Sequence, residues 1–88
     1  MSDRDRIEAF LEMMSAERGA AANTLDAYAR DLSDASEFCS GSLTTASGQD
    51  LAAWQADLSA RGMAASTSAR KLSAARRFFR FLFEEGDR

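Results

Sequence analysis

The chain has 88 residues, enough for one domain with a single modest hydrophobic core. Hydrophobic residues make up 45% of it and charged residues 28%, a balance that excludes a disordered chain and is typical of folded globular proteins. No stretch approaches the roughly 18 consecutive apolar residues of a membrane span, and residues 1–6 do not resemble a signal peptide. We therefore expect one cytoplasmic domain over residues 1–88, with no membrane partner.

The side chains that usually carry out catalysis are scarce. The chain has no histidine and one cysteine, so the common zinc-ligand sets, an internal disulfide and most acid–base chemistry at neutral pH are excluded. Cys39 falls on the expected apolar side of its helix, which favours a structural thiol over a nucleophile. Tyr28 has no nearby group in sequence to activate it, and there is no glycine-rich phosphate loop. We expect no catalytic residues, no metal and no cofactor in this chain.

Charge is distributed unevenly along the chain. Residues 1–60 hold eleven acids and four bases, whereas residues 61–88 hold seven bases and three acids. Between Arg61 and Phe83 there are six bases and no acid. Although the formal net charge is −3, this asymmetry indicates a basic face on an acidic body, which is suited to local binding of nucleic acid. The alternative is a basic helix that is simply solvated.

The glycines divide the chain into four segments of helical length, and no proline interrupts them. The first expected helix, residues 3–18, ends before Gly19. Its apolar residues have the i, i+3, i+4, i+7 spacing of one helical face: Ile7, Phe10, Leu11 and Met14. This pattern predicts an amphipathic helix that packs on a core.

Two further helices are expected over residues 23–40 and 47–60. The second begins at Asn23, whose side chain is suited to cap the exposed amides, with Asp26 in the first turn. The third repeats this logic with Ser47 and Asp50, and it places Trp54 in the core.

The fourth expected helix, residues 66–85, is the most informative. A helical projection places its buried stripe at Leu72, Ala75, Phe79, Leu82 and Phe83. The opposite face carries Ser66, Arg70, Ser73, Arg77 and Arg80. We predict an all-α bundle packed around Phe10, Leu11, Leu25, Leu32, Leu51, Trp54, Leu72 and Phe79.

The polar face of this fourth helix is what a helix laid in a major groove of DNA requires. Arginine side chains bind guanine edges and phosphates, and hydroxyl groups bind the DNA backbone. Because it projects toward this face, Phe81 is expected to be exposed. That expectation supports an alternative function, a protein-interaction module that uses the phenylalanine-rich end of the helix.

Several short sequence motifs, taken in their order along the chain, closely resemble those of one protein family. In the second expected helix the motifs are Asn23-Thr24-Leu25, Tyr28 and Arg30-Asp31-Leu32, and the loop from Leu58 to Met63 follows the third helix. The fourth helix contributes Ser66-Thr67, the run from Arg70 to Arg76, and the run from Phe78 to Leu82. Together they are similar to the N-terminal, core-binding domain of tyrosine recombinases of the Xer type, also called the SAM-like domain of phage-type integrases.

The resemblance implies a small orthogonal four-helix bundle that binds double-stranded DNA. In that family the second and fourth helices enter the major groove on one side of a recombination half-site, and a catalytic domain closes the other side. Carried over to this chain, the DNA-binding residues are Thr24, Arg30, Ser66, Thr67, Arg70, Lys71, Ser73 and Arg77. Arg70, Arg77 and Thr24 are expected at the centre of the surface, and Lys71 and Arg30 at its margins.

The resemblance also implies partners. They are a recombination half-site, the catalytic domain of the same parent chain, which we take to be absent from residues 1–88, and other recombinase subunits. A third possibility compatible with DNA binding is assembly within a recombinase tetramer through residues 3–18. Whether such a recombinase would resolve chromosomes or integrate mobile elements is left open by the sequence. Charge reversal at Arg70 and Arg77 is expected to leave folding almost intact, because both are expected on a solvated face.

Overall fold

The computed structural model describes residues 2–86, and within that range it has four α-helices and no strand. These are α1 (Asp3–Arg18), α2 (Ala22–Phe38), α3 (Gly48–Ala60) and α4 (Ala65–Glu84), with a short 3-10 helix, η1 (Leu43–Thr45), before α3. The predicted all-α, four-helix fold is therefore confirmed, and each α-helix begins and ends within two residues of its expected bounds. The 3-10 helix was not anticipated.

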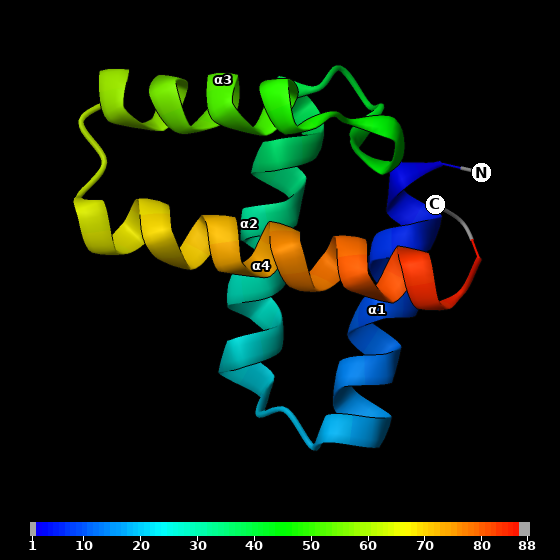
Figure 1. Cartoon of the computed structure of the whole chain (residues 1–88). Coiled ribbons are helices and arrows are strands. Elements are labelled where there is room, and N and C mark those ends of the chain that lie inside the picture. The colour runs from blue at the N-terminus through cyan, green and yellow to red at the C-terminus, as the bar shows by residue number, and fades with distance from the viewer. Residues whose placement is uncertain (1, 87–88) are drawn as a thin grey trace.

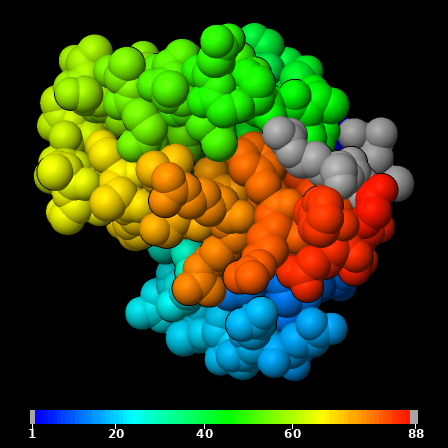
Figure 2. Space-filling model, in the orientation of Figure 1, coloured from blue at the N-terminus to red at the C-terminus, as the bar shows by residue number. Residues whose placement is uncertain are grey.

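The helices form two crossed antiparallel pairs (Figure 1). Helices α1 and α2 make one pair, and α3 and α4 make the other, with α4 lying across α1 and α2. The Cα positions span 35 × 26 × 16 Å. The shortest dimension fits two helical layers whose axes are about 8–10 Å apart. With only two layers, one side of α4 has no helix over it, and the amino-terminal half of α2 emerges beside it (Figure 2).

Local sequence explains some helix ends well and others poorly. Gly19 ends α1 in the left-handed conformation with φ of 61°, and Ser47 and Asp50 form the capping box expected at α3. Asn23, however, lies inside the first turn of α2. The residue at the N-cap is Ala21, whose side chain cannot accept a hydrogen bond from the exposed amides. The prediction for Asn23 was wrong because a cap contributes only about 1 kcal/mol, less than the packing of a helix face onto a core.

Phe10 of α1 lies at the centre of the core. Its ring centroid is 5.7 Å from those of both Phe78 and Phe81 in α4, and 6.1 Å from that of Tyr28 in α2. Of the predicted core, Phe10, Leu32 and Trp54 are fully buried. The other five predicted core residues are only partly buried: Leu11, Leu25, Leu51, Leu72 and Phe79.

The buried stripe of α4 is offset by one residue from the predicted one. It consists of Lys71, Ala74, Ala75, Phe78, Phe81 and Leu82. Phe81 is only 7% exposed and Phe83 is 74% exposed, so both predictions for these rings were wrong. Apolar side chains occupy so much of the helix between residues 78 and 83 that periodicity alone permits neighbouring registers. Packing against Phe10 decides which register is used.

A buried carboxylate joins the start of α1 to the segment after α2. Asp3 accepts hydrogen bonds from the backbone amides of Leu43, at 2.9 Å, and Thr44, at 3.3 Å, and from the hydroxyl of Ser36. Because an unsatisfied buried amide or carboxylate is costly, these bonds stabilise this corner of the fold. Within residues 2–86, no helix combines the length and apolar character that a bilayer crossing requires.

Candidate nucleic-acid interface

The solvent-facing side of α4 carries the polar residues that the sequence grouped together. Five residues from both halves of the helix are exposed, as predicted: Ser66, Arg70, Ser73, Arg77 and Arg80. Arg76 and Ala69 are exposed as well. We call this set of seven residues the α4 face. Its polar members are four arginines and two serines, so it is basic along most of its length.

The crossing of α2 and α4 contains a buried carboxylate, Asp31, whose side chain is 0% exposed. Arg70 donates two hydrogen bonds to it, from Nε to Oδ2 at 3.2 Å and from Nη2 to Oδ1 at 2.9 Å. Lys71 donates a third, from Nζ to Oδ1 at 3.1 Å. Such charge-assisted, two-point pairing fixes the plane of a guanidinium group. One edge of the Arg70 guanidinium group, formed by Nε and Nη2, is therefore held by Asp31, although the side chain remains 51% exposed.

Lys71 lies on the buried stripe rather than on the α4 face. Its side chain is only 9% exposed, and its ammonium group also lies 3.5 Å from Asp34. The expectation that Lys71 lies at the margin of a DNA-facing surface therefore does not fit its position. One sequence feature hinted at this pairing: Asp31 follows Tyr28 by three residues and precedes Ala35 by four, so it falls on the core side of its helix. A buried acid requires a buried partner.

A second ion-pair group involves the end of α3. Arg61 donates to both carboxylate oxygens of Asp34, each at 3.1 Å, and its Nε lies 2.9 Å from Asp57. Half of the six bases between residues 61 and 83 therefore have internal acidic partners. Within residues 2–86, the arginines of this segment that form no ion pair are Arg76, Arg77 and Arg80. The positive charge available to a ligand is concentrated on the carboxyl-terminal half of α4.

These pairs correct one expectation about charge reversal. Glutamate at position 70 would place a second carboxylate against buried Asp31, so the double change of Arg70 and Arg77 would disturb folding. Hydrogen bonding by Asp31 raises the pKa of Arg70 above its usual value, and the charge of Asp31 adds to this, so Arg70 stays charged. Variants that test binding alone therefore belong at Arg77 and Arg80.

The expected residues of α2 are divided between two sides of that helix. Thr24 is exposed and precedes Asp31 by seven residues, about two turns, so it lies on the side that α4 crosses. Arg30 is exposed but, as the neighbour of Asp31, is rotated from it by about 100°. Thr67, in the first turn of α4, is partly buried. Thr24 thus lies on the side of α2 that faces α4, Arg30 lies about a quarter of a turn away from that side, and Lys71 lies on the buried stripe beneath the α4 face.

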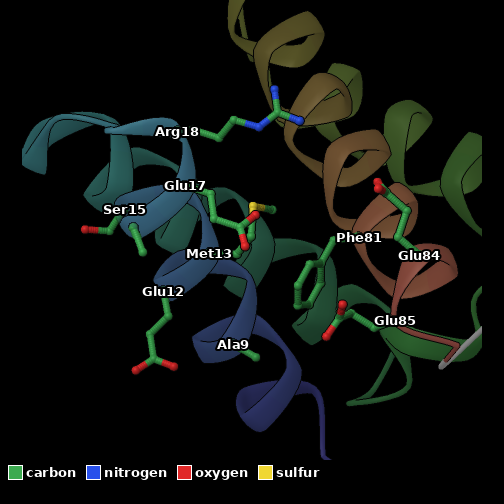
Figure 3. Close-up of a pocket in the computed structure, with 10 residues that line it drawn as sticks. Ala9, Glu12, Met13, Ser15, Glu17, Arg18, Phe81, Glu84 and Glu85 are labelled. Carbon is green, nitrogen blue, oxygen red and sulfur yellow. The ribbon is translucent and has the colours of Figure 1, made fainter.

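A depression between α1 and the end of α4 has a different character (Figure 3). Phe81, Met13 and Ala9 line it together with four carboxylates: Glu12, Glu17, Glu84 and Glu85. Arg18 is the one base among these lining residues, so the depression has a net negative charge that repels phosphate, and it is not part of the candidate DNA-binding surface. Within residues 2–86, no three histidine, cysteine, aspartate or glutamate side chains gather closely enough to hold a metal ion.

Comparison with known proteins gives a consistent result. Residues 7–86 match the family described as phage integrase, N-terminal SAM-like domain. The chain is 55% identical over 91 residues to a protein of Agrobacterium fabrum named tyrosine recombinase XerD, covering 98% of this chain and 28% of that protein. Proteins of the same name from Rhizobium meliloti and Caulobacter vibrioides are 55% and 50% identical over 83 and 82 residues.

These two matches cover 91% and 90% of this chain, and 27% of each relative. The chain thus spans little more than a quarter of the length of the curated relatives it matches. No solved structure gave a significant match. The resemblance based on residues 23–32 and 58–82 is confirmed, and the chain belongs to the family of phage integrase N-terminal SAM-like domains, with tyrosine recombinases as its relatives.

Proposed function

We propose that this chain is the DNA-binding N-terminal domain of a tyrosine recombinase and that it grips one face of a duplex half-site with α2 and α4. The proposal rests on the α4 face, which exposes four arginines and two serines. No acid occurs between residues 61 and 83 to offset their charge. Three of these arginines form no ion pair within residues 2–86, so their charge is available to phosphates.

The shape of the surface suits a major groove. An α-helix with its side chains is about 10–12 Å across, and the major groove of B-form DNA is about 12 Å wide. With α4 in the groove, Arg76, Arg77 and Arg80 bind phosphates, and the hydroxyls of Ser66 and Ser73 bind the DNA backbone. Thr24 on the adjoining side of α2 extends the contact along the duplex, with Arg30 and Thr67 at its edges.

In this proposal the chain supplies affinity and position, and DNA cleavage is carried out by a catalytic domain of the parent recombinase. That domain closes on the other side of the duplex, and other recombinase subunits complete the assembly. Residues 1–88 act as one binding domain. These partners rest on the family resemblance and on the names of the relatives.

The alternative, a protein-interaction module built on the phenylalanine-rich end of α4, has lost most of its surface. Phe78 and Phe81 are buried, Phe79 is partly buried, and Phe83 remains as the one exposed ring of the four. A single exposed aromatic side chain is ordinary on a protein surface.

Salt dependence separates the two functions. The experiment is a fluorescence anisotropy titration of the 88-residue chain with a labelled duplex of mixed sequence at about 50 and 150 mM NaCl. We expect micromolar or weaker binding that falls about 50-fold between these concentrations if about four phosphates are neutralised. Phe83→Ser should bind as the wild type does. Absence of binding at the lower salt, or an affinity that does not respond to salt, would overturn the proposal.

A further inference from the structure

The four arginines of the α4 face differ in whether the protein itself fixes their side chains. Arg70 is fixed by two hydrogen bonds to buried Asp31, whereas Arg76, Arg77 and Arg80 form no ion pair within residues 2–86. All four are exposed on the same helix. The difference indicates that Arg70 has a role that the other three do not share.

The geometry leaves a defined part of Arg70 free. Asp31 occupies the edge formed by Nε and Nη2, and a guanidinium group has five N–H donors in one plane. Both hydrogens of Nη1 and the second hydrogen of Nη2 remain available. They form the end of the fork, which can make two parallel hydrogen bonds to a pair of acceptors.

Lys71 preserves the positive charge that Arg70 needs to bind DNA. A one-to-one pair of Arg70 and Asp31 would be neutral, but Lys71 also binds Asp31. Arg61 balances Asp34, the second acid near Lys71, so Arg70, Lys71 and Asp31 together carry one net positive charge. Because Lys71 is almost completely buried, it offsets the carboxylate without competing with Arg70 for a ligand. An exposed side chain that is already fixed also loses less rotamer freedom when it binds.

On the basis of the proposed function, we propose that Asp31 is a positioning residue that makes Arg70 the specificity-determining donor of the interface, with its Nη1–Nη2 end bound to O6 and N7 of a guanine. A phosphate accepts hydrogen bonds from many directions, so an arginine such as Arg77, which forms no ion pair within residues 2–86, is sufficient for it. A guanine edge presents two acceptors in a fixed plane at a fixed depth, and this favours a fork with a fixed orientation.

The test is a selection from a random duplex pool, followed by sequencing of the bound fraction for three proteins. The wild type should enrich one guanine position by about 5- to 150-fold over the other bases, the range expected for a good two-point contact. Arg70→Lys should lose this preference, because its ammonium group keeps the charge and is able to pair with Asp31 but has no planar fork. Arg77→Lys is the matched control and should keep the preference.

The role of Asp31 is tested with Asp31→Asn, which preserves size and removes the charge. It should lose the guanine preference with little change in the salt dependence of binding, and the Nε–Hε NMR signal of Arg70 should exchange faster with solvent. Circular dichroism checks folding. If this variant does not fold, Arg70→Lys decides the outcome.

A folded Asp31→Asn or an Arg70→Lys variant that retains the guanine preference would overturn the inference. Loss of the preference in Arg77→Lys would overturn it as well. Replacing the selected guanine by 7-deazaguanine, which lacks the N7 acceptor, should weaken the wild type but not Arg70→Lys. If wild type binds duplex DNA with no guanine preference, only this inference fails. If wild type binds no duplex, the proposed function fails with it.

Discussion

The phenylalanines at the end of α4 differ sharply in their surroundings. Phe78 is fully buried and contacts the ring of Phe10 edge to face, whereas Phe83 is 74% exposed. These two rings are only five residues apart in sequence, so the difference comes from the register of the helix and not from composition. The effect of each substitution on the free energy of unfolding should therefore follow the burial of the residue that it replaces.

Phe78→Ala should lower the free energy of unfolding by about 3–5 kcal/mol, because it leaves a cavity beside Phe10. Phe83→Ala should change it by less than about 0.5 kcal/mol, as is usual for a surface position. Urea denaturation followed by circular dichroism measures both. Equal losses in the two variants would contradict the observed register of α4.

Cys39 should react slowly with alkylating reagents. Partial burial raises the pKa of its thiol, and the negative charges of Asp50 and Asp3 add to this effect. A raised pKa means less thiolate near pH 8, so iodoacetamide should modify Cys39 more slowly than a cysteine in an unfolded peptide, and the rate should rise with pH. The folded state also retains the proton more strongly, so this group's stabilising contribution is present at lower pH and is lost as pH rises through the folded pKa. Modification as fast as in the peptide would show that the thiol is unprotected.

At the scale of the elements, the crossing of α2 and α4 is held by polar as well as apolar contacts. Asp31 is completely buried and has two cationic partners from α4, Arg70 and Lys71. Removal of one member of a buried ion pair leaves the other without compensation, and this typically costs more than the pair contributes.

Asp31→Ala should therefore destabilise the domain by about 3–5 kcal/mol, enough to unfold much of a protein this small. Adding Lys71→Met should recover part of the loss, because the buried ammonium group is removed together with its partner. Thermal or urea unfolding of both single variants and the double variant gives the coupling energy. Purely additive losses would show that the two side chains do not depend on each other.

Helix caps provide a matched pair of changes. Ser47→Ala removes the capping box of α3 and should cost about 1 kcal/mol. Helix α4 begins after Ala64, which has no capping side chain, so Ala64→Ser should stabilise the fold by about 0.5–1 kcal/mol. The two unfolding midpoints should move in opposite directions. A stabilising Ser47→Ala would contradict the capping geometry.

The sequence predicted the elements better than their contacts. Helix bounds follow from features a few residues apart, such as Gly19 after α1 and the Ser47–Asp50 pair, and the structure confirms both. The partners of Asp31 lie 39 and 40 residues away, and those of Asp3 lie 33 to 41 residues away. No local pattern specifies such pairs. The same limit explains Lys71, which was expected on the exposed side of α4 but is buried beneath it, in contact with Asp31.

In the molecule as a whole, an acidic chain carries a basic face along α4 within residues 2–86. The formal net charge is −3, yet Arg76, Arg77 and Arg80 lie together on the open side of α4. Arg4 is also well exposed, but it lies near Ser33 and Glu37, on the side of α2 away from α4. Position can therefore be separated from total charge by changing arginines at the two places.

The most direct test of DNA binding by the α4 face compares two variants with the same net charge. Arg77→Gln with Arg80→Gln removes two positive charges from the face, and Arg4→Glu changes the charge by the same amount elsewhere. Both are titrated against a labelled duplex over a series of salt concentrations, with circular dichroism to confirm folding. The double variant should bind at least about tenfold more weakly and lower the salt slope by about 1.8, whereas Arg4→Glu should match the wild type. Equal weakening by both variants, or wild-type affinity in a folded double variant, would show that the α4 face is not the DNA-binding surface.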